Sequence, residues 1–131
     1  MTGSLDTNLL LRLVINDMPK EADLVKRLIE STGESFSVAD IVFVELDFAM
    51  RKHYGMSRSE TCEILLYLVA SPSLNLNKLM LEKALPIYQS HPALSLVDIM
   101  LSIYANINNA NPLWTFDKKL ASQLPNAELL N

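Results

Sequence analysis

Cysteine, glycine and long apolar runs are scarce in this chain of 131 residues, and each shortage excludes a class of protein. The single cysteine, Cys62, has no partner for an intramolecular disulfide and is typical of a reducing cytosol. Three glycines are too few for a turn-rich β protein. No apolar run approaches the roughly 18 residues of a membrane span, and no basic-then-apolar leader opens the sequence. We therefore expect a cytoplasmic protein without a membrane segment.

The composition is that of a globular chain. Hydrophobic residues make up 50% of the sequence, enough for one domain with a real core. No linker, repeat or low-complexity stretch divides the chain, so we expect residues 1–131 to form a single domain. The formal net charge of −4 argues against nucleic-acid binding by simple electrostatics, unless a bound metal neutralises several of the acids.

Helical periods alternate with short apolar segments along the chain. Such alternation implies a parallel sheet with helices on both faces, so we predict an α/β protein of three layers, α/β/α, with a short, mostly parallel central sheet. Pro86 should kink or split its helix. The expected strands are one around Leu5, then 35–38, 74–76, 113–116 (buried) and 127–130, and the expected helices are 9–15, 19–30, 40–54, 57–70, 77–90, 95–106 and 117–124.

Three aspartates occupy one kind of place in this pattern. Asp6 and Asp117 follow predicted strands, and Asp98 lies in the first turn of a helix that begins after Ser95. Each alone is explained by helix capping, and Ser95 with Asp98 would form a capping box. Because the carboxyl ends of parallel strands share one edge of a sheet, the three acids can also converge there.

Glu45 is the fourth acid. Its neighbours one turn away are Ile41, Phe48 and Ala49, so we expect it on the apolar face of its helix, pointing inward. A buried carboxylate needs a cation, either a side chain such as Arg12 or a metal. Four converging carboxylates would repel one another without a hard cation, and oxygen ligands favour Mg²⁺ or Mn²⁺ over zinc.

The sequence thus suggests a metal site in which polar residues next to the acids hold the carboxylates in orientation. The predicted metal-binding and catalytic residues are Asp6, Glu45, Asp98 and Asp117, with Thr7, Asn8 and Thr115 in support. His53 and His91 lack a zinc pattern, and no phosphate-binding loop or dinucleotide glycine pattern occurs. A receiver-type phosphoacceptor domain requires paired acids after the first strand, whereas here Asp6 is followed by Thr7-Asn8.

Four short stretches in this order resemble one known family. They are LDTNLL at 5–10, VEL at 44–46, DIMLSIYA at 98–105 and TFDKKL at 115–120, and the ending at 124–130 also fits. Together they resemble the PIN-domain ribonucleases, specifically the VapC-type toxins of toxin–antitoxin pairs. Two departures are Leu94 and Leu96, which stand where the family often carries an aromatic residue, and the scarcity of basic residues near the acids.

The resemblance implies a function. It implies a PIN-like fold and a Mg²⁺- or Mn²⁺-dependent endoribonuclease, the toxin of a toxin–antitoxin pair, in which metal-activated water hydrolyses RNA phosphodiester bonds. It also implies a homodimer and a small antitoxin, whose apolar helix we expect in a groove formed by residues 9–30 and 57–70, including Leu10, Leu13, Leu24 and Leu66. The alternatives are a non-catalytic interaction module with the same fold and, less favoured, a receiver-type domain.

Overall fold

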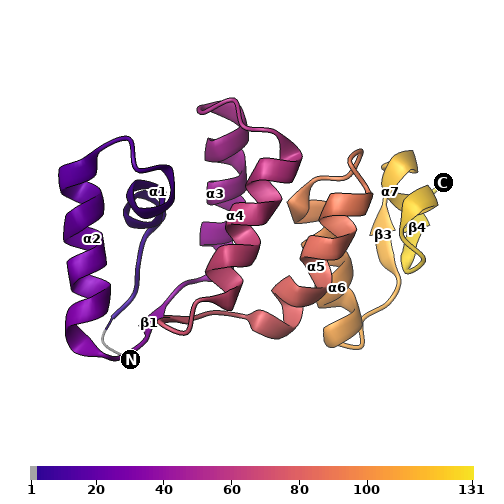
Figure 1. The fold of residues 1–131 in the computed structure, drawn as a ribbon. Helices are drawn as coiled ribbons and strands as arrows, with labels where there is room; N and C mark the ends of the chain where they lie inside the picture. Colours follow the sequence, from indigo (N-terminus) through magenta and orange to yellow (C-terminus); the bar gives the residue numbers. More distant parts are fainter. Residues whose placement is uncertain (1–2) are drawn as a thin grey trace. The chain divides into compact units, whose positions relative to one another are not determined.

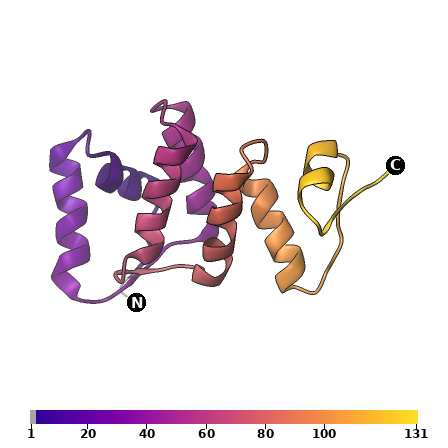
Figure 2. The ribbon, with the colours of Figure 1, turned by 45° about the vertical axis from the view of Figure 1, so that its right-hand side comes forward.

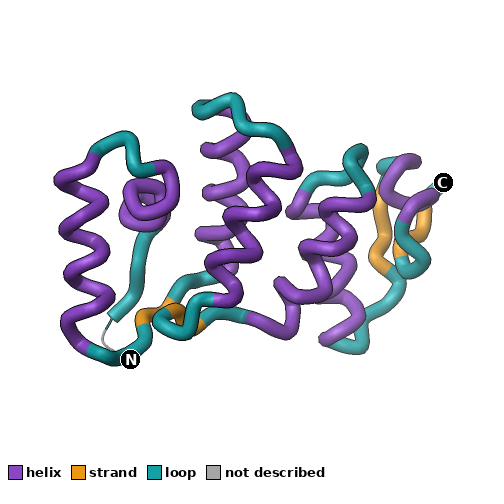
Figure 3. Tube along the Cα trace, viewed as in Figure 1, coloured by secondary structure: helices purple, strands orange, loops and turns teal. Residues whose placement is uncertain are grey.

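The computed structural model describes residues 3–131, which fall into two compact units. The first unit is Met1–Asn77 and the second is Lys78–Asn131, and each is described by itself. Within residues 3–131 the chain forms seven helices and four short strands (Figure 1). Helices dominate both units, and the strands contain only two or three residues each (Figure 3).

The first unit contains four helices and one parallel strand pair. Strand β1 (Phe36–Ser37) pairs with β2 (Leu74–Asn75), and Ser4 forms a single parallel bridge to Ser37 on β1. The predicted parallel pairing is confirmed, although the strand expected around Leu5 is reduced to this bridge. The helices are α1 (Thr7–Ile15), α2 (Pro19–Thr32), α3 (Asp40–Lys52) and α4 (Arg58–Ala70).

Local signals explain where these helices begin and end. Pro19 is the first residue of α2, and Gly33 ends that helix in the left-handed conformation at φ 65°, which glycine adopts without strain. Ser57 and Glu60 form a reciprocal capping box at the start of α4. Helix α1 packs on α2 and α3, and α3 packs on α4 (Figure 1). The fully buried side chains between them include Leu10, Phe43, Leu46, Met50, Leu65 and Leu68.

The second unit contains a helix pair and a small β-α-β element. Helices α5 (Lys78–Ser90) and α6 (Leu96–Ile107) pack side by side (Figure 2). Strand β3 (Leu113–Thr115) pairs in parallel with β4 (Ala127–Leu129), and α7 (Lys118–Gln123) connects them. Pro86 lies inside α5 without splitting it. The core of this unit includes Met80, Leu81, Leu85, Tyr88, Leu96 and Ile99.

A hydrogen-bond network ties the segment before β4 to α6. The Asn126 side-chain amide donates to the Ser102 carbonyl and to Asn111 Oδ1, both at 2.9 Å, and the Ser102 hydroxyl donates back to Asn126 Oδ1. Ser102 is buried, so its polar groups have no access to water and need these hydrogen bonds as partners.

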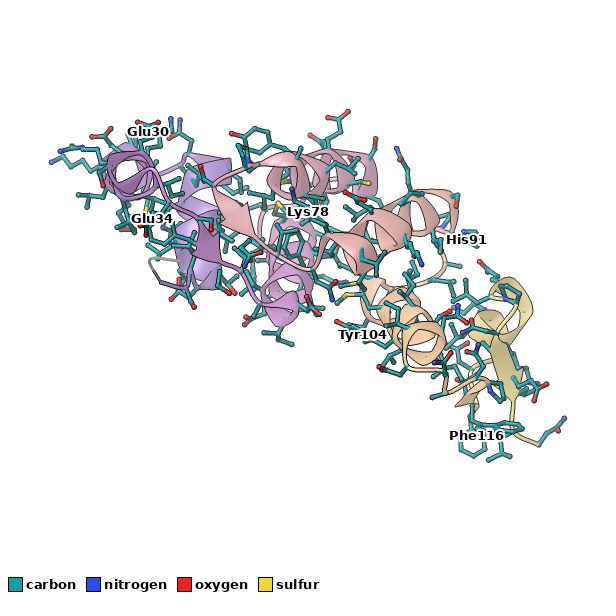
Figure 4. The ribbon with its side chains drawn as sticks, turned by 90° about the horizontal axis from the view of Figure 1, so that it is seen from below. Glu30, Glu34, Lys78, His91, Tyr104 and Phe116 are labelled. Carbon is teal, nitrogen blue, oxygen red and sulfur yellow. The ribbon has the colours of Figure 1, made fainter. Side chains whose placement is uncertain are left out.

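The strand expected at 113–116 is present as Leu113–Thr115, but the expectation that it is buried is wrong. Trp114 is 57% exposed and Phe116 is 79% exposed, and the Phe116 ring lies at the periphery of its unit (Figure 4). Leu113 and Thr115 are half-buried, so exposure alternates along β3. Successive side chains of a strand point to opposite faces, and within this unit α6 and α7 contact the strand. The apolar residues at 113–116 suggested burial on both faces of the strand, whereas the structure leaves one face exposed.

Candidate acidic site

Asp6 lies where the first paired segment meets α1. The Leu5 amide donates to the Ser37 carbonyl of β1 at 2.9 Å, and α1 begins two residues later. Asp6 is the N-cap of that helix, and its Oδ1 accepts a 3.0 Å bond from the Leu9 amide. The side chain is exposed, and its other carboxylate oxygen accepts no hydrogen bond from residues 3–131. The predicted strand-to-helix corner and the capping role are both present.

Glu45 lies on α3 and is held by the first turn of α1. Its Oε1 accepts a 2.7 Å hydrogen bond from the Thr7 hydroxyl. Thr7 is the first residue of α1, directly after the Asp6 cap. The chain therefore brings two acids from distant sequence positions to the same place through one short segment.

Asp6 and Glu45 line one open cleft of about 590 Å³ in the first unit. Helix α1 contributes Thr7, Asn8 and Leu11 to this cleft, and α3 contributes the opposite wall. The residues of that wall are Val44, Glu45, Phe48 and Ala49, with His53 following the helix. Phe48 and His53 were not among the predicted site residues; the available signal was that Phe48 comes one turn after Glu45.

The expected inward orientation of Glu45 is wrong. Glu45 is exposed, and Ile41 and Phe48 on the same side of α3 are 63% and 57% exposed. The helix instead buries Val42, Phe43, Leu46 and Met50. Almost every residue from Ile41 to Met50 is apolar, so helical periodicity could not distinguish the two faces. Packing against α1 and α4 selects the buried face.

Arg12 is not the partner of Glu45, contrary to the alternative raised from the sequence. Its Nε bonds Glu21 Oε2 at 3.1 Å, and its Nη1 lies 3.4 Å from Asp17 Oδ1. Nη1 also donates to the Tyr54 hydroxyl at 3.4 Å. The hydrogen bond to Tyr54, followed by the charges of Asp17 and Glu21, raises the pKa of Arg12. Arg12 therefore joins α1 to the start of α2 and the end of α3.

Asp98 lies in the first turn of α6, as predicted, and is half-buried. Its backbone amide donates to Ser95 Oγ at 3.1 Å, which is one half of the expected capping box. The reciprocal bond, from the Ser95 amide to the carboxylate, is not formed. Within residues 3–131 the Asp98 carboxylate has neither a hydrogen bond nor an ion pair, so capping does not account for its charge.

Asp117 is the N-cap of α7. Its Oδ1 accepts bonds from the amides of Lys119 at 2.9 Å and Leu120 at 3.2 Å. Thr115 bonds the backbone amide of Asp117, at 3.0 Å, rather than its carboxylate. Thr115 therefore positions the turn that carries Asp117, and one oxygen of that exposed carboxylate accepts no hydrogen bond from the described part of the chain.

The donor chemistry of the four acids fits a hard divalent cation. All four offer only carboxylate oxygen, and none forms an ion pair with a lysine or arginine in the part of the chain described. Oxygen ligands of this kind suit Mg²⁺ or Mn²⁺. The acids are divided equally between the units, and neither unit alone gathers three possible ligands among its described residues. One shared site therefore stays a prediction.

The fold and the acids together define a class of protein, an α/β chain with four carboxylates that have no cationic partner within residues 3–131. The family model described as PIN domain matches residues 4–123, and the chain belongs to this family. The predicted α/β class and PIN-like fold are thus confirmed. PIN domains are usually nucleases that act on RNA or DNA, and they commonly bind Mg²⁺ or Mn²⁺.

The remaining comparisons add no relative. No curated protein and no solved structure matches the chain. Among residues 3–131, no helix has both the length and the apolar character needed to cross a membrane.

Proposed function

We propose that this protein is a Mg²⁺- or Mn²⁺-dependent endoribonuclease that hydrolyses RNA phosphodiester bonds. The observation that carries the proposal is the shared cleft of Asp6 and Glu45, two carboxylates without a cationic partner in the described chain of a PIN-domain protein. Asp98, whose carboxylate is also unpaired within residues 3–131, is the third ligand, and Asp117 is a second-site or water-mediated ligand.

Each ligand has a defined role in this proposal. The Thr7 bond occupies Glu45 Oε1 and the capping bond occupies Asp6 Oδ1, so each carboxylate is held in orientation and keeps one oxygen for a ligand. Asn8 lines the same cleft and supports the acids or the substrate from α1. A divalent cation held by these carboxylates would supply acidification of a water for in-line attack on phosphorus and neutralisation of phosphate charge. The expected product carries a 5′-phosphate.

A groove beside α1 supports the proposed antitoxin partner. This groove, about 450 Å³, lies between α1 and α2 and is lined by Leu9, Arg12, Glu21, Leu24, Val25 and Leu28, together with Asp6 and Asn8. Leu24 is 62% exposed and available to an apolar helix. Leu10 is fully buried, and neither Leu13 nor any residue of 57–70, Leu66 included, lines this groove, so it has only part of the predicted lining. Because Asp6 and Asn8 line both the groove and the acidic cleft, a bound helix would lie beside a proposed metal ligand.

The remaining features of the proposal follow from the toxin assignment. We propose a cytoplasmic toxin of a toxin–antitoxin pair that acts as a homodimer and is inhibited by a small protein encoded beside it. Co-expression with the neighbouring small reading frame should yield one co-purifying complex. Recovery of free monomer alone would contradict the partner assignment.

A non-catalytic interaction module is the second candidate. Asp6 and Asp117 each cap a helix, so a protein without activity would also keep them for stability. Glu45 and Asp98 distinguish the candidates, because neither carboxylate caps a helix among the described residues. The family match argues against the receiver-type domain.

Cleavage of RNA in defined metals tests the proposal. Purified protein is incubated with total RNA in Mg²⁺, Mn²⁺ or EDTA, and discrete fragments are expected only with metal. Glu45→Gln should abolish cleavage while leaving the fold intact. Glu82→Gln, which removes a charge from an exposed position of α5, is the matched control and should cleave normally. Stoichiometric RNA binding without turnover would favour the interaction module.

A further inference from the structure

An exposed aromatic ring forms part of the acidic cleft. Phe48 is 57% exposed on α3, whose opposite face is buried. Its ring meets that of His53 edge-on, with centroids 5.8 Å apart and an interplanar angle of 78°. Both side chains line the cleft that contains Asp6 and Glu45. The cleft therefore combines acidic groups with an aromatic surface.

We propose that Phe48 is a base-stacking residue, which receives an unpaired nucleobase next to the phosphate being cut, and that His53 holds its ring in position. This inference rests on the proposed function and adds a specificity-determining residue to it.

Helix geometry places the ring at a suitable distance from the acids. Phe48 follows Glu45 by three residues on α3, and side chains three apart on a helix have Cβ atoms roughly 5–6 Å apart. A nucleotide whose phosphate lies at Asp6 and Glu45 carries its base on the adjoining sugar. The cleft, at about 590 Å³, is of ligand size and can hold that base against Phe48.

The chemistry of the cleft favours an unpaired base over a duplex. Bases in an RNA duplex are stacked on each other, and side chains cannot read them through its narrow major groove, whereas bases of single strands can be splayed onto aromatic residues. The chain has a net charge of −4, so phosphate attraction provides little affinity. Stacking on an aromatic side chain provides affinity that does not depend on net charge.

The same helix contains a matched control. Ile41 is 63% exposed on α3 but does not line the cleft. If exposure of an apolar side chain were the only relevant property, Ile41→Ala and Phe48→Ala would have equal effects on RNA. Stacking predicts an effect of Phe48→Ala alone. Two further variants separate apolar volume from aromatic stacking. Phe48→Leu keeps apolar volume without a ring, and Phe48→Trp keeps a stacking surface.

The first test measures stacking directly and does not require cleavage. A short single-stranded RNA carrying 2-aminopurine beside the cut position is titrated with full-length protein in Ca²⁺, without Mg²⁺ or Mn²⁺, and fluorescence reports stacking of that base. Wild type, Ile41→Ala and Phe48→Trp should quench the probe. Phe48→Ala and Phe48→Leu should not, and should bind the RNA roughly tenfold to a hundredfold more weakly. Equal quenching by Phe48→Leu would overturn the proposal.

The second test is a double-mutant cycle in which one change is made in the protein, at Phe48, and the other in the RNA, at the base beside the cut position. Removing the base beside the cut position should raise KM for wild type by about the same factor as Phe48→Ala does on intact RNA, and should have no further effect on Phe48→Ala. Independent, multiplying effects would overturn the proposal. Melting temperatures equal to wild type show that the variants fold. Failure of wild type to cut RNA in any metal overturns the nuclease assignment as well, whereas cutting with unchanged KM in Phe48→Ala overturns the stacking role alone.

Discussion

The Thr7 hydroxyl and Oε1 of Glu45 form a 2.7 Å hydrogen bond between residues 38 positions apart in the chain. The bond joins the first turn of α1 to the outer face of α3, next to Asp6. It holds an exposed carboxylate that no lysine or arginine neutralises within residues 3–131. Thr7 is therefore the residue through which the orientation of Glu45 can be tested.

We predict that Thr7→Val weakens metal binding about tenfold to a hundredfold, the usual effect of removing a group that orients a ligand. Thr7→Ser keeps the hydroxyl and should behave as wild type. The measurement is Mn²⁺ affinity by calorimetry, with the metal dependence of cleavage as a second readout. Equal affinity in all three proteins would show that the hydrogen bond is only structural.

Asp6 has two separable roles, and two substitutions separate them. Asp6→Asn keeps an N-cap oxygen but removes the charge, so it should abolish cleavage with little change in stability. Asp6→Ala also removes the cap and should cost about 1 kcal/mol of unfolding free energy. Urea denaturation and an RNA cleavage assay on both variants measure the two effects. Cleavage by a folded Asp6→Asn protein would remove Asp6 from the catalytic set.

For Asp98, the response of the melting temperature to metal is decisive. Its cap bond uses the backbone amide, so Asp98→Asn keeps that bond. If the four acids converge, the variant should melt higher than wild type in EDTA because like-charge repulsion is relieved. Wild type should then gain about 2.7 kcal/mol at a metal concentration of 100 Kd, and the variant less.

The competing role of Asp98 predicts the opposite thermal pattern. If the charge of Asp98 only interacts with the positive end of the α6 dipole, it contributes about 0.3–1 kcal/mol to the free energy of unfolding. Asp98→Asn would then melt lower than wild type, with no dependence on metal. Thermal melts of both proteins in EDTA and in millimolar Mg²⁺ distinguish these outcomes. Asp117→Asn, which keeps the α7 cap, should impair cleavage less than Asp98→Asn.

The capping box of α4 predicts a pH effect that is independent of the acidic site. The Ser57 amide donates to Glu60 Oε1 at 3.0 Å, and the hydrogen bonds to Ser57 lower the pKa of Glu60. Because the folded pKa lies below the unfolded value of about 4.3, this stabilisation is present above that pH and is lost as pH falls through the folded value. Glu60→Gln should therefore melt below wild type at pH 6, and the difference should shrink as pH falls through the folded pKa of Glu60, in thermal melts at each pH.

The local elements and the four acidic motifs were predictable because their signals lie within a few residues of one another. Ser57 with Glu60, Pro19 and Gly33 marked helix ends as expected. Asp6 and Asp117 were recognised as caps, and the structure shows the capping bonds. The family itself was evident from stretches of three to eight residues, and its match spans residues 4–123.

The sequence by itself determined most of the helix ends, the parallel direction of the strand pairs and the segment that carries each acid, because local backbone preferences and spacing encode them. Only the tertiary structure decided which face of α3 is exposed, because the mostly apolar stretch from Ile41 to Met50 has no periodicity that separates the two faces. That choice turned Glu45 outward toward Thr7 and placed Phe48 beside His53 in the cleft. The long-range bonds of Thr7 with Glu45, and of Ser102 with Asn126, arise only when packed helices bring distant residues together.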